Sequence, residues 1–284
     1  MIRLLAVDMD GTCLDRCSRM TDRTLSALRE AARRGVVIVP ATGRNLECLP
    51  HRLAAGTLCR TGSRDDYANQ GLFRYVISSN GAKVTDICKK KTVFQASIPQ
   101  RDALSLLEKC RGKGLGTAVH VRHRYLLQGR VLTAAGLILY GKDAKGAYCV
   151  RDMEEFISRN GCEVEEFQFY FITPGSKRKL HSVLEGYPAL RGAYTPIYAE
   201  VFSEYASKGN ALKALAARLG IGKDEIACIG DGENDLPMFA ASGFRIAMGN
   251  AVEALKKRAD HVTEANSRDG AARAIEQYIL KGNL

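Results

Sequence analysis

The chain has 284 residues, enough for one large domain or two ordinary ones with a hydrophobic core each. Its nine cysteines are odd in number and never form a Cys-x-x-Cys pair, so the sequence predicts neither a disulfide framework nor a zinc site. No apolar run reaches the roughly 18 residues of a membrane span, and the N-terminus does not read as a signal peptide. We therefore expect a cytoplasmic protein with no membrane partner.

The formal net charge of +11 is spread along the chain instead of forming one block. Short basic runs at 89–91, 177–179 and 256–258 lie far apart, as solvated surface charges do. A diffuse basic field draws a small phosphate ester towards a site as readily as it attracts a polyanion. We therefore expect a small phosphorylated metabolite as the partner and no nucleic acid.

Two carboxylates follow the first apolar run of the chain. Asp8-Met-Asp10-Gly11-Thr12 comes directly after Leu4–Val7, a predicted buried strand. Residues two apart in an extended chain point to the same side, so both carboxylates can share a pocket, and Gly11 allows a sharp turn. Like charges that close require a cation, and a hard divalent ion such as Mg²⁺ suits oxygen ligands. The pattern favours phosphoryl transfer through an aspartate; the alternative is an acidic turn that ends a strand.

Strands alternate with helices in the N-terminal and C-terminal parts of the chain. This alternation predicts an α/β fold in which a Rossmann-like parallel sheet is covered by helices on both faces. The predicted strands span 2–8, 36–40, 74–79, 226–230, 244–247 and 261–263, and the predicted helices span 22–34, 45–54, 209–219, 233–241, 251–258 and 268–280.

The middle of the chain has a different pattern, because several strands follow one another without a helix between them. We therefore predict an inserted α+β domain at 85–198, with the core formed by 1–84 and 199–284. The polar stretch 56–71 is predicted to be an irregular surface segment without an assigned role. In the insert, strands are predicted at 92–98, 116–121, 125–128 and 167–173, and helices at 101–110, 152–158 and 177–184.

Polar residues also follow the second predicted strand. Thr42-Gly43-Arg44 offers a hydroxyl and free backbone N–H groups at the start of a predicted helix, which is a favourable seat for phosphate. The alternative is that Thr42 only caps the helix. Lys208 stands at the start of another predicted helix, where it either reaches a neighbouring phosphate as a point charge or lies on the surface.

The segment Gly230–Asp235 follows an apolar strand and leads into a helix. It supplies Asp231 and Asp235 for a metal and the Asn234 amide for a phosphate oxygen, although acidic residues at a helix start also stabilise the helix dipole. Loops at the carboxyl ends of parallel strands are where α/β sheets bind ligands. We therefore expect these segments to meet at one edge of the sheet.

Together these segments resemble the four motifs of haloacid dehalogenase-like (HAD) phosphatases. The nearest group is the Cof-type sugar phosphatases, whose Ser-Asn-Gly-Ala and Gly-Asn-Ala segments match 79–82 and 249–251. The C-terminal residues Val262-Thr263, Asn266 and Asp269-Gly270 complete the pattern. The resemblance covers nearly all of the core, whereas the insert matches a cap domain in position and size only.

The resemblance implies roles for the core residues. Asp8 would attack phosphorus to form an aspartyl-phosphate, and Asp10 would act as the general acid and then the general base. Mg²⁺ would be held by Asp8, the backbone carbonyl of Asp10 and Asp231, with Asp235 in or near the layer of groups that surrounds these ligands. Phosphate would be bound by Lys208, Thr42, Gly43, Asn234 and the Met9 backbone N–H, with Arg44 and Asn80 as weaker candidates.

The same resemblance implies a cap that closes over the site and selects the leaving group. Candidate substrate contacts in it are His120, Arg122, His123, Arg124 and Tyr170, although such residues more often lie on a surface or in a core.

The expected function is Mg²⁺-dependent hydrolysis of small phosphate monoesters by a monomer or homodimer. A phosphomutase of the same superfamily is one alternative, although no second phosphate site is recognisable in the insert. A non-catalytic phosphate-binding protein is the other, although such a protein has little need of Asp10.

Overall fold

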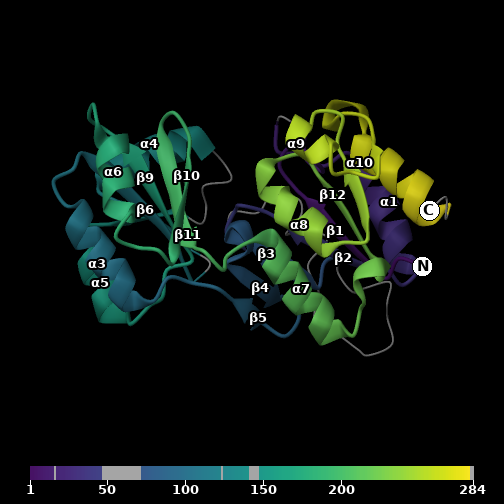
Figure 1. Cartoon of the computed structure of the whole chain (residues 1–284), viewed down its shortest axis with the longest axis horizontal. Helices are drawn as coiled ribbons and strands as arrows, with labels where there is room; N and C mark the ends of the chain where they lie inside the picture. Colours follow the sequence, from purple (N-terminus) through teal and green to yellow (C-terminus); the bar gives the residue numbers. More distant parts are fainter. Residues whose placement is uncertain (16, 47–71, 123, 141–146, 282–284) are drawn as a thin grey trace. The chain divides into compact units, whose positions relative to one another are not determined.

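The computed structural model describes residues 1–15, 17–46, 72–122, 124–140 and 147–281 (Figure 1). The predicted helix at 45–54 and the segment 56–71 fall almost entirely outside these ranges, as does His123. The described residues group into two compact units. The core unit contains 1–43, 72–95 and 207–281, and the insert unit contains 44–46 and the described part of 96–206. Among the described residues, no helix combines the length and the apolarity needed to cross a bilayer.

An eight-stranded sheet forms the centre of the core unit, in the order β14-β13-β12-β1-β2-β3-β4-β5. The strands from β14 to β3 run parallel, and β4 and β5 add an antiparallel hairpin at one edge. This confirms the predicted α/β core. The strands are β1 (Leu4–Asp8), β2 (Val37–Ala41), β3 (Tyr75–Ser78), β4 (Lys83–Asp86), β5 (Lys91–Gln95), β12 (Ile226–Gly230), β13 (Phe244–Ala247) and β14 (His261–Val262).

The central strands are short, apolar and buried along their whole length, as a sheet covered on both faces requires. Helix α1 lies beside α10, and α7 lies beside α8 on the other face of the sheet (Figure 1). The α-helices of this unit are α1 (Asp22–Arg33), α7 (Lys208–Leu219), α8 (Leu236–Ala241), α9 (Glu253–Lys256) and α10 (Gly270–Ala274). Short 3₁₀ segments span Ser79–Gly81, Lys223–Glu225, Glu233–Asp235 and Asn266–Arg268, and a π-helix spans Ile275–Leu280.

The insert unit is built on a six-stranded sheet in the order β10-β11-β9-β6-β7-β8. All neighbours are antiparallel except β7 and β8, so the predicted α+β character is confirmed. Helices α3, α5 and α6 pack on one face, around Phe167 and Phe169, and α4 contacts β7 and β8. The elements are α3 (Gln100–Cys110), β6 (Leu115–Val121), β7 (Arg124–Gln128), α4 (Arg130–Tyr140), β8 (Ala147–Val150), α5 (Met153–Asn160), β9 (Glu166–Phe171), α6 (Ser176–Leu184), β10 (Leu190–Tyr194) and β11 (Tyr198–Ser203).

The strand predicted at 92–98 was assigned to the wrong sheet. It corresponds to β5, which pairs with β4 in the core sheet, and β4 itself was not predicted. The sequence also missed α4, β8, β10 and β11. The compact units divide at 95/96 and 206/207, because the β4–β5 hairpin hydrogen-bonds to β3 while β11 pairs with β9. That 85–198 acts as a substrate-selecting domain stays a prediction.

One face of the insert sheet carries buried polar side chains. The Tyr125 hydroxyl donates to Gln168 Oε1 at 2.6 Å, and Gln168 Nε2 donates to Glu166 Oε1 at 3.3 Å. His120 is only 5% exposed, and burial lowers its pKa to about 4, although the charge of Glu165 opposes the shift. A buried neutral histidine of this kind is part of the packing of the insert unit.

Replacement of His120 by Gln is expected to flatten the pH dependence of stability. The folded chain keeps His120 neutral down to about pH 4, whereas the unfolded chain takes up a proton near pH 6.5, so stability is lost as the pH falls through this window. The loss amounts to roughly 3 kcal/mol at most. Urea unfolding at about pH 7 and pH 5 measures it. Replacement of the exposed His181 by Gln is the control, and this variant should lose as much stability as the parent. If all three proteins lost the same free energy of unfolding between about pH 7 and pH 5, the prediction would be contradicted.

Candidate active site

Three carboxylates meet at the carboxyl ends of β1 and β12. Asp8 is the last residue of β1, and Asp231 follows β12, its parallel neighbour in the sheet. Each of Asp8, Asp231 and Asp235 offers an oxygen that lies within 4.8 Å of the others. Asp8 and Asp235 are buried, and Asp231 is partly exposed. The topology thus gathers acidic groups that are more than 220 residues apart in sequence.

A single ammonium group lies among these carboxylates. Lys208 Nζ donates to Asp8 Oδ1 at 2.5 Å and to Asp235 Oδ1 at 2.7 Å, and its side chain is fully buried. Lys208 is the first residue of α7, where the Ser207 hydroxyl accepts a hydrogen bond from the Asn210 N–H at 3.1 Å and caps the helix. Because one ammonium lies beside three carboxylates, ionisation of all three would leave two negative charges in the cluster.

Burial and this charge imbalance together shift the pKa values of the cluster. Burial raises the pKa of Asp8 well above its usual range; Lys208 opposes the rise, and Asp235 and Asp231 add to it. Burial alone would lower the pKa of Lys208, but the Asp235 and Asp8 carboxylates outweigh it and raise that pKa. Lysine therefore stays charged, and the remaining negative charge must be balanced by a proton or a cation. Buried carboxylate oxygens suit a hard divalent cation, so the residues fit a metal site.

Hydrogen bonds hold Asp231 in position. Thr12 Oγ1 donates to its Oδ1 at 2.9 Å, and Asn250 Nδ2 donates to its Oδ2 at 3.3 Å and to the Gly11 carbonyl at 2.9 Å. Gly11 has φ +80°, and a Cβ there would lie 2.3 Å from Asp231 Oδ2. Only glycine therefore allows the turn after Asp10 to approach the carboxylate so closely.

Asp235 has a different set of partners. Its Oδ2 accepts from the backbone N–H groups of Asp231 and Gly232 at 2.9 and 3.0 Å, while its Oδ1 accepts from Lys208. Both oxygens are thus engaged within the protein. Asp235 therefore links the backbone of the loop after β12 to the Lys208 ammonium group, and these hydrogen bonds fix the position of the loop and of the lysine side chain.

The sequence analysis predicted no role for the residues that support Asp231. Thr12 and Asn250 belong to segments that match the family's motifs, but their contact with Asp231 arises only in the folded chain. Asn250 is held in turn by Asn266, whose backbone N–H donates to Asn250 Oδ1 at 2.9 Å and whose Nδ2 donates to the Leu14 carbonyl at 2.8 Å. The polar character of these motif segments was the only signal that could have identified them.

The predicted phosphate-binding residues of the core unit lie at the same end of the sheet. Thr42 follows β2, whose last residue is level with Asp8. Asn234 is exposed in the loop after β12, and the Met9 side chain is buried while its carbonyl accepts from Thr12 and Leu14. Asp10 is exposed and is not among the three clustered carboxylates.

The other described residues predicted to contact the substrate, except Asn80, belong to the insert unit and not to the unit that holds the carboxylate cluster. Arg44 follows Gly43 in the chain but groups with the insert unit. Arg122 and Arg124 are exposed, and His120 is buried. Tyr170 shares a hydrogen bond with the Tyr125 hydroxyl at 2.8 Å.

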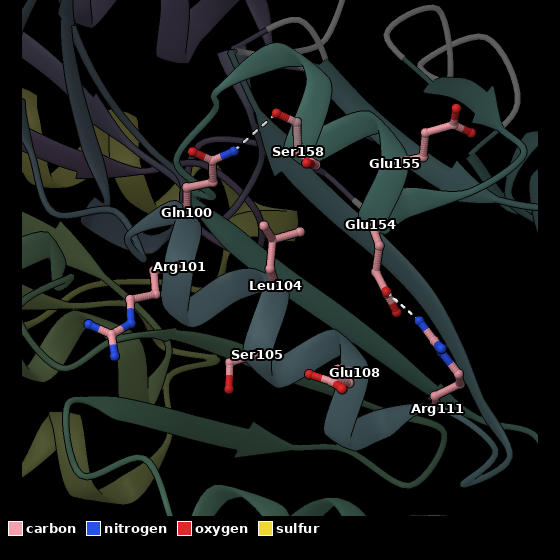
Figure 2. Close-up of a pocket in the computed structure, with 9 residues that line it drawn as sticks. All are labelled: Gln100, Arg101, Leu104, Ser105, Glu108, Arg111, Glu154, Glu155 and Ser158. Carbon is pink, nitrogen blue, oxygen red and sulfur yellow. Dashed lines mark hydrogen bonds and ion pairs between the residues drawn. The ribbon is translucent and has the colours of Figure 1, made fainter.

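The insert unit also contains an open groove of about 820 Å³ between α3 and α5 (Figure 2). Its charged side chains include an ion pair between Arg111 and Glu154, and Gln100 donates to the Ser158 carbonyl. None of its lining residues was predicted to belong to the active site. They are Gln100, Arg101, Leu104, Ser105, Glu108, Arg111, Glu154, Glu155 and Ser158.

A family model described as haloacid dehalogenase-like hydrolase matches residues 5–275. The chain belongs to this family. It is 30% identical to a phosphoglycolate phosphatase from Archaeoglobus fulgidus over 274 residues, which cover 96% of each chain. It is 28% identical to the phosphatase YwpJ of Bacillus subtilis over 306 residues, covering 98% of this chain and 100% of the relative. The resemblance predicted from the motifs is confirmed.

The solved structures agree at the level of the fold. A haloacid dehalogenase-like hydrolase from Bacteroides thetaiotaomicron aligns with a TM-score of 0.81 and 22% identity, covering 98% of this chain and 99% of that one. The shared architecture includes both the parallel core sheet and the second, mixed sheet. The family match, together with phosphatase relatives aligned over nearly their whole length, makes the chain a HAD-like phosphatase, a phosphoric monoester hydrolase.

Replacement of Lys208 by Met is expected to destabilise the chain by about 3 kcal/mol, because two buried carboxylates lose their counter-charge. Adding Asp235→Asn should recover part of the loss. Lys213 lies exposed on the same helix, so Lys213→Met is the matched control. Urea unfolding measures the free energy of unfolding of the parent and of these three variants. A Lys208→Met variant as stable as the Lys213→Met control would contradict the prediction.

Proposed function

We propose that this phosphatase hydrolyses small phosphate monoesters, such as sugar phosphates or similar metabolites, through an aspartyl-phosphate on Asp8 and with Mg²⁺ as its metal. The observation that carries the proposal is the placement of Lys208 Nζ between the Asp8 and Asp235 carboxylates. This contact holds one Asp8 oxygen in a fixed direction at the end of β1. A carboxylate held in this way is pre-organised as a nucleophile.

In this proposal Asp8 and Asp231 would supply side-chain oxygens to Mg²⁺, together with the Asp10 backbone carbonyl. Asp235 would lie beside the ion without binding it directly, since both of its oxygens already accept hydrogen bonds from the protein. When bound, the ion would offset the cluster's remaining negative charge and that of the incoming phosphate.

The proposed reaction has two steps. An Asp8 oxygen forms a bond to phosphorus while the bond to the leaving oxygen breaks, and Asp10 donates a proton to that oxygen. Asp10 then takes a proton from water, whose oxygen attacks phosphorus and releases phosphate from Asp8. The exposed position of Asp10, two residues after the buried Asp8, supports this division of roles.

Phosphate oxygens would be bound by Lys208, the Thr42 hydroxyl, the Gly43 backbone, the Asn234 amide and the Met9 backbone N–H. Donors aimed at a transferring phosphoryl group stabilise the charge that develops on it. Arg44 is proposed as a further contact. The insert unit is proposed to select the leaving group as a cap.

The substrate class rests on the resemblance to sugar phosphatases and on relatives that are phosphatases, one of them for phosphoglycolate. The competing proposal is a phosphomutase, which would return the phosphoryl group to another hydroxyl. Incubation with a panel of sugar phosphates separates the two, because hydrolysis releases free phosphate and a mutase yields an isomer. Absence of phosphate release from the whole panel would refute the substrate proposal.

Removal of divalent cations with EDTA is expected to abolish phosphate release, because the carboxylate cluster would then repel the substrate. Addition of Mg²⁺ in excess of the chelator should restore it, and addition of Na⁺ at equal ionic strength should not. The rate of phosphate release from an aryl phosphate provides the measurement. Full activity in EDTA would rule out the metal.

Replacement of Asp8 by Asn is expected to lower kcat by at least ~10³-fold, because the amide is a poor nucleophile. Asp10→Asn should cost about 10²- to 10⁴-fold, the usual contribution of a general acid and base. Glu233→Gln, an exposed change in the 230–235 loop, is the control and should keep the parent rate. Substantial activity in the Asp8→Asn variant would exclude Asp8 as the nucleophile.

A further inference from the structure

The turn between β3 and β4 has an unusual backbone. Ser79, Asn80 and Gly81 have φ values of +48°, +52° and +93°, so three successive residues occupy the left-handed region. Two of them are not glycine, and such conformations persist only where the surroundings enforce them. Ser79 and Asn80 are both buried, at 0% and 8% exposure.

The turn is enforced by its contact with the start of α7. A Cβ on Gly81 would lie 2.1 Å from the Ser207 carbonyl carbon and 2.5 Å from the Lys208 nitrogen. The backbone of the turn is therefore pressed against the residues that place the buried lysine. Any L side chain at Gly81 would push the two segments apart.

Asn80 itself joins two other segments of the active site. Its backbone N–H donates to the Thr42 carbonyl at 3.1 Å, and its Oδ1 accepts from Asn234 Nδ2 at 3.1 Å. A Cβ on Gly43 would lie 3.0 Å from the same Oδ1. One buried amide thus contacts the Thr42-Gly43 segment and the Asn234 amide.

The two asparagines differ in exposure, and this difference indicates which side chain positions the other. Asn234 is exposed and able to reach a ligand, while Asn80 is buried and fixed by its backbone. An exposed amide that a hydrogen bond to a buried side chain already orients loses less conformational freedom when it binds phosphate, so binding costs less free energy.

We propose that Asn80 is a positioning residue that orients the Asn234 amide for the substrate's phosphate group. This inference rests on the proposed function, in which Asn234 binds a phosphate oxygen. The left-handed turn at 79–81 serves to bring the Asn80 amide to this place between the Thr42-Gly43 segment, the start of α7 and the loop after β12.

A double-mutant cycle tests the inference with Asn80→Gly, Asn234→Ala and the double variant. Glycine accepts the φ of +52° without strain, so the first change removes the side chain and keeps the turn. The readouts are kcat/KM for an aryl phosphate in Mg²⁺ and the inhibition constant of inorganic phosphate. Urea unfolding of each variant confirms that the fold is retained.

Asn234→Ala is expected to lower kcat/KM by about 10- to 100-fold, the range for a hydrogen bond to a charged group. Asn80→Gly should cost about 5- to 20-fold and weaken phosphate inhibition in parallel, and the double variant should be no worse than Asn234→Ala within about twofold.

Losses that multiply in the double variant would overturn the inference, as would an Asn80→Gly variant with parental kinetics beside an impaired Asn234→Ala. Parental kinetics in Asn234→Ala would instead refute the phosphate role of Asn234 in the proposed function, which keeps the two failures distinct.

Discussion

The contact on which the site depends is the ammonium group of Lys208 between the carboxylates of Asp8 and Asp235. Without a positive charge at this point, two buried carboxylates could not both remain ionised. With it, one oxygen of Asp8 is fixed, the loop after β12 is tied down through Asp235, and the cluster keeps a net negative charge that suits a divalent cation. Orientation and electrostatics thus come from one side chain.

The polar residues around this cluster divide into two groups. Thr12 and Asn250 donate hydrogen bonds to Asp231, and the Asn266 backbone N–H donates to Asn250 in turn. In the second group, the left-handed turn at 79–81 packs against the start of α7, and its Asn80 side chain accepts a hydrogen bond from Asn234. Asp231, a proposed metal ligand, and Asn234, a proposed phosphate ligand, therefore each contact an asparagine, a side chain that donates and accepts hydrogen bonds without adding charge.

Much of this arrangement could be predicted from sequence, because buried parallel strands are recognisable and the polar residues that follow them gather at one edge of the sheet. That reasoning brought Asp8, Lys208 and Asp231 together. It failed for the β4–β5 hairpin, because an exposed antiparallel edge strand has no distinctive pattern and its sheet is decided by pairing alone. The contacts of Asn250 with Asp231 and of Asn234 with Asn80 join distant segments, so local pattern does not reveal them.

The most direct test of the account is to trap the covalent intermediate. The protein is mixed with substrate and Mg²⁺, quenched during turnover with borohydride, which reduces an acyl phosphate to an alcohol, and mapped by peptide mass spectrometry. The account predicts homoserine at position 8, dependent on both substrate and Mg²⁺. Reduction at any other aspartate, or active turnover with position 8 unchanged, would contradict it.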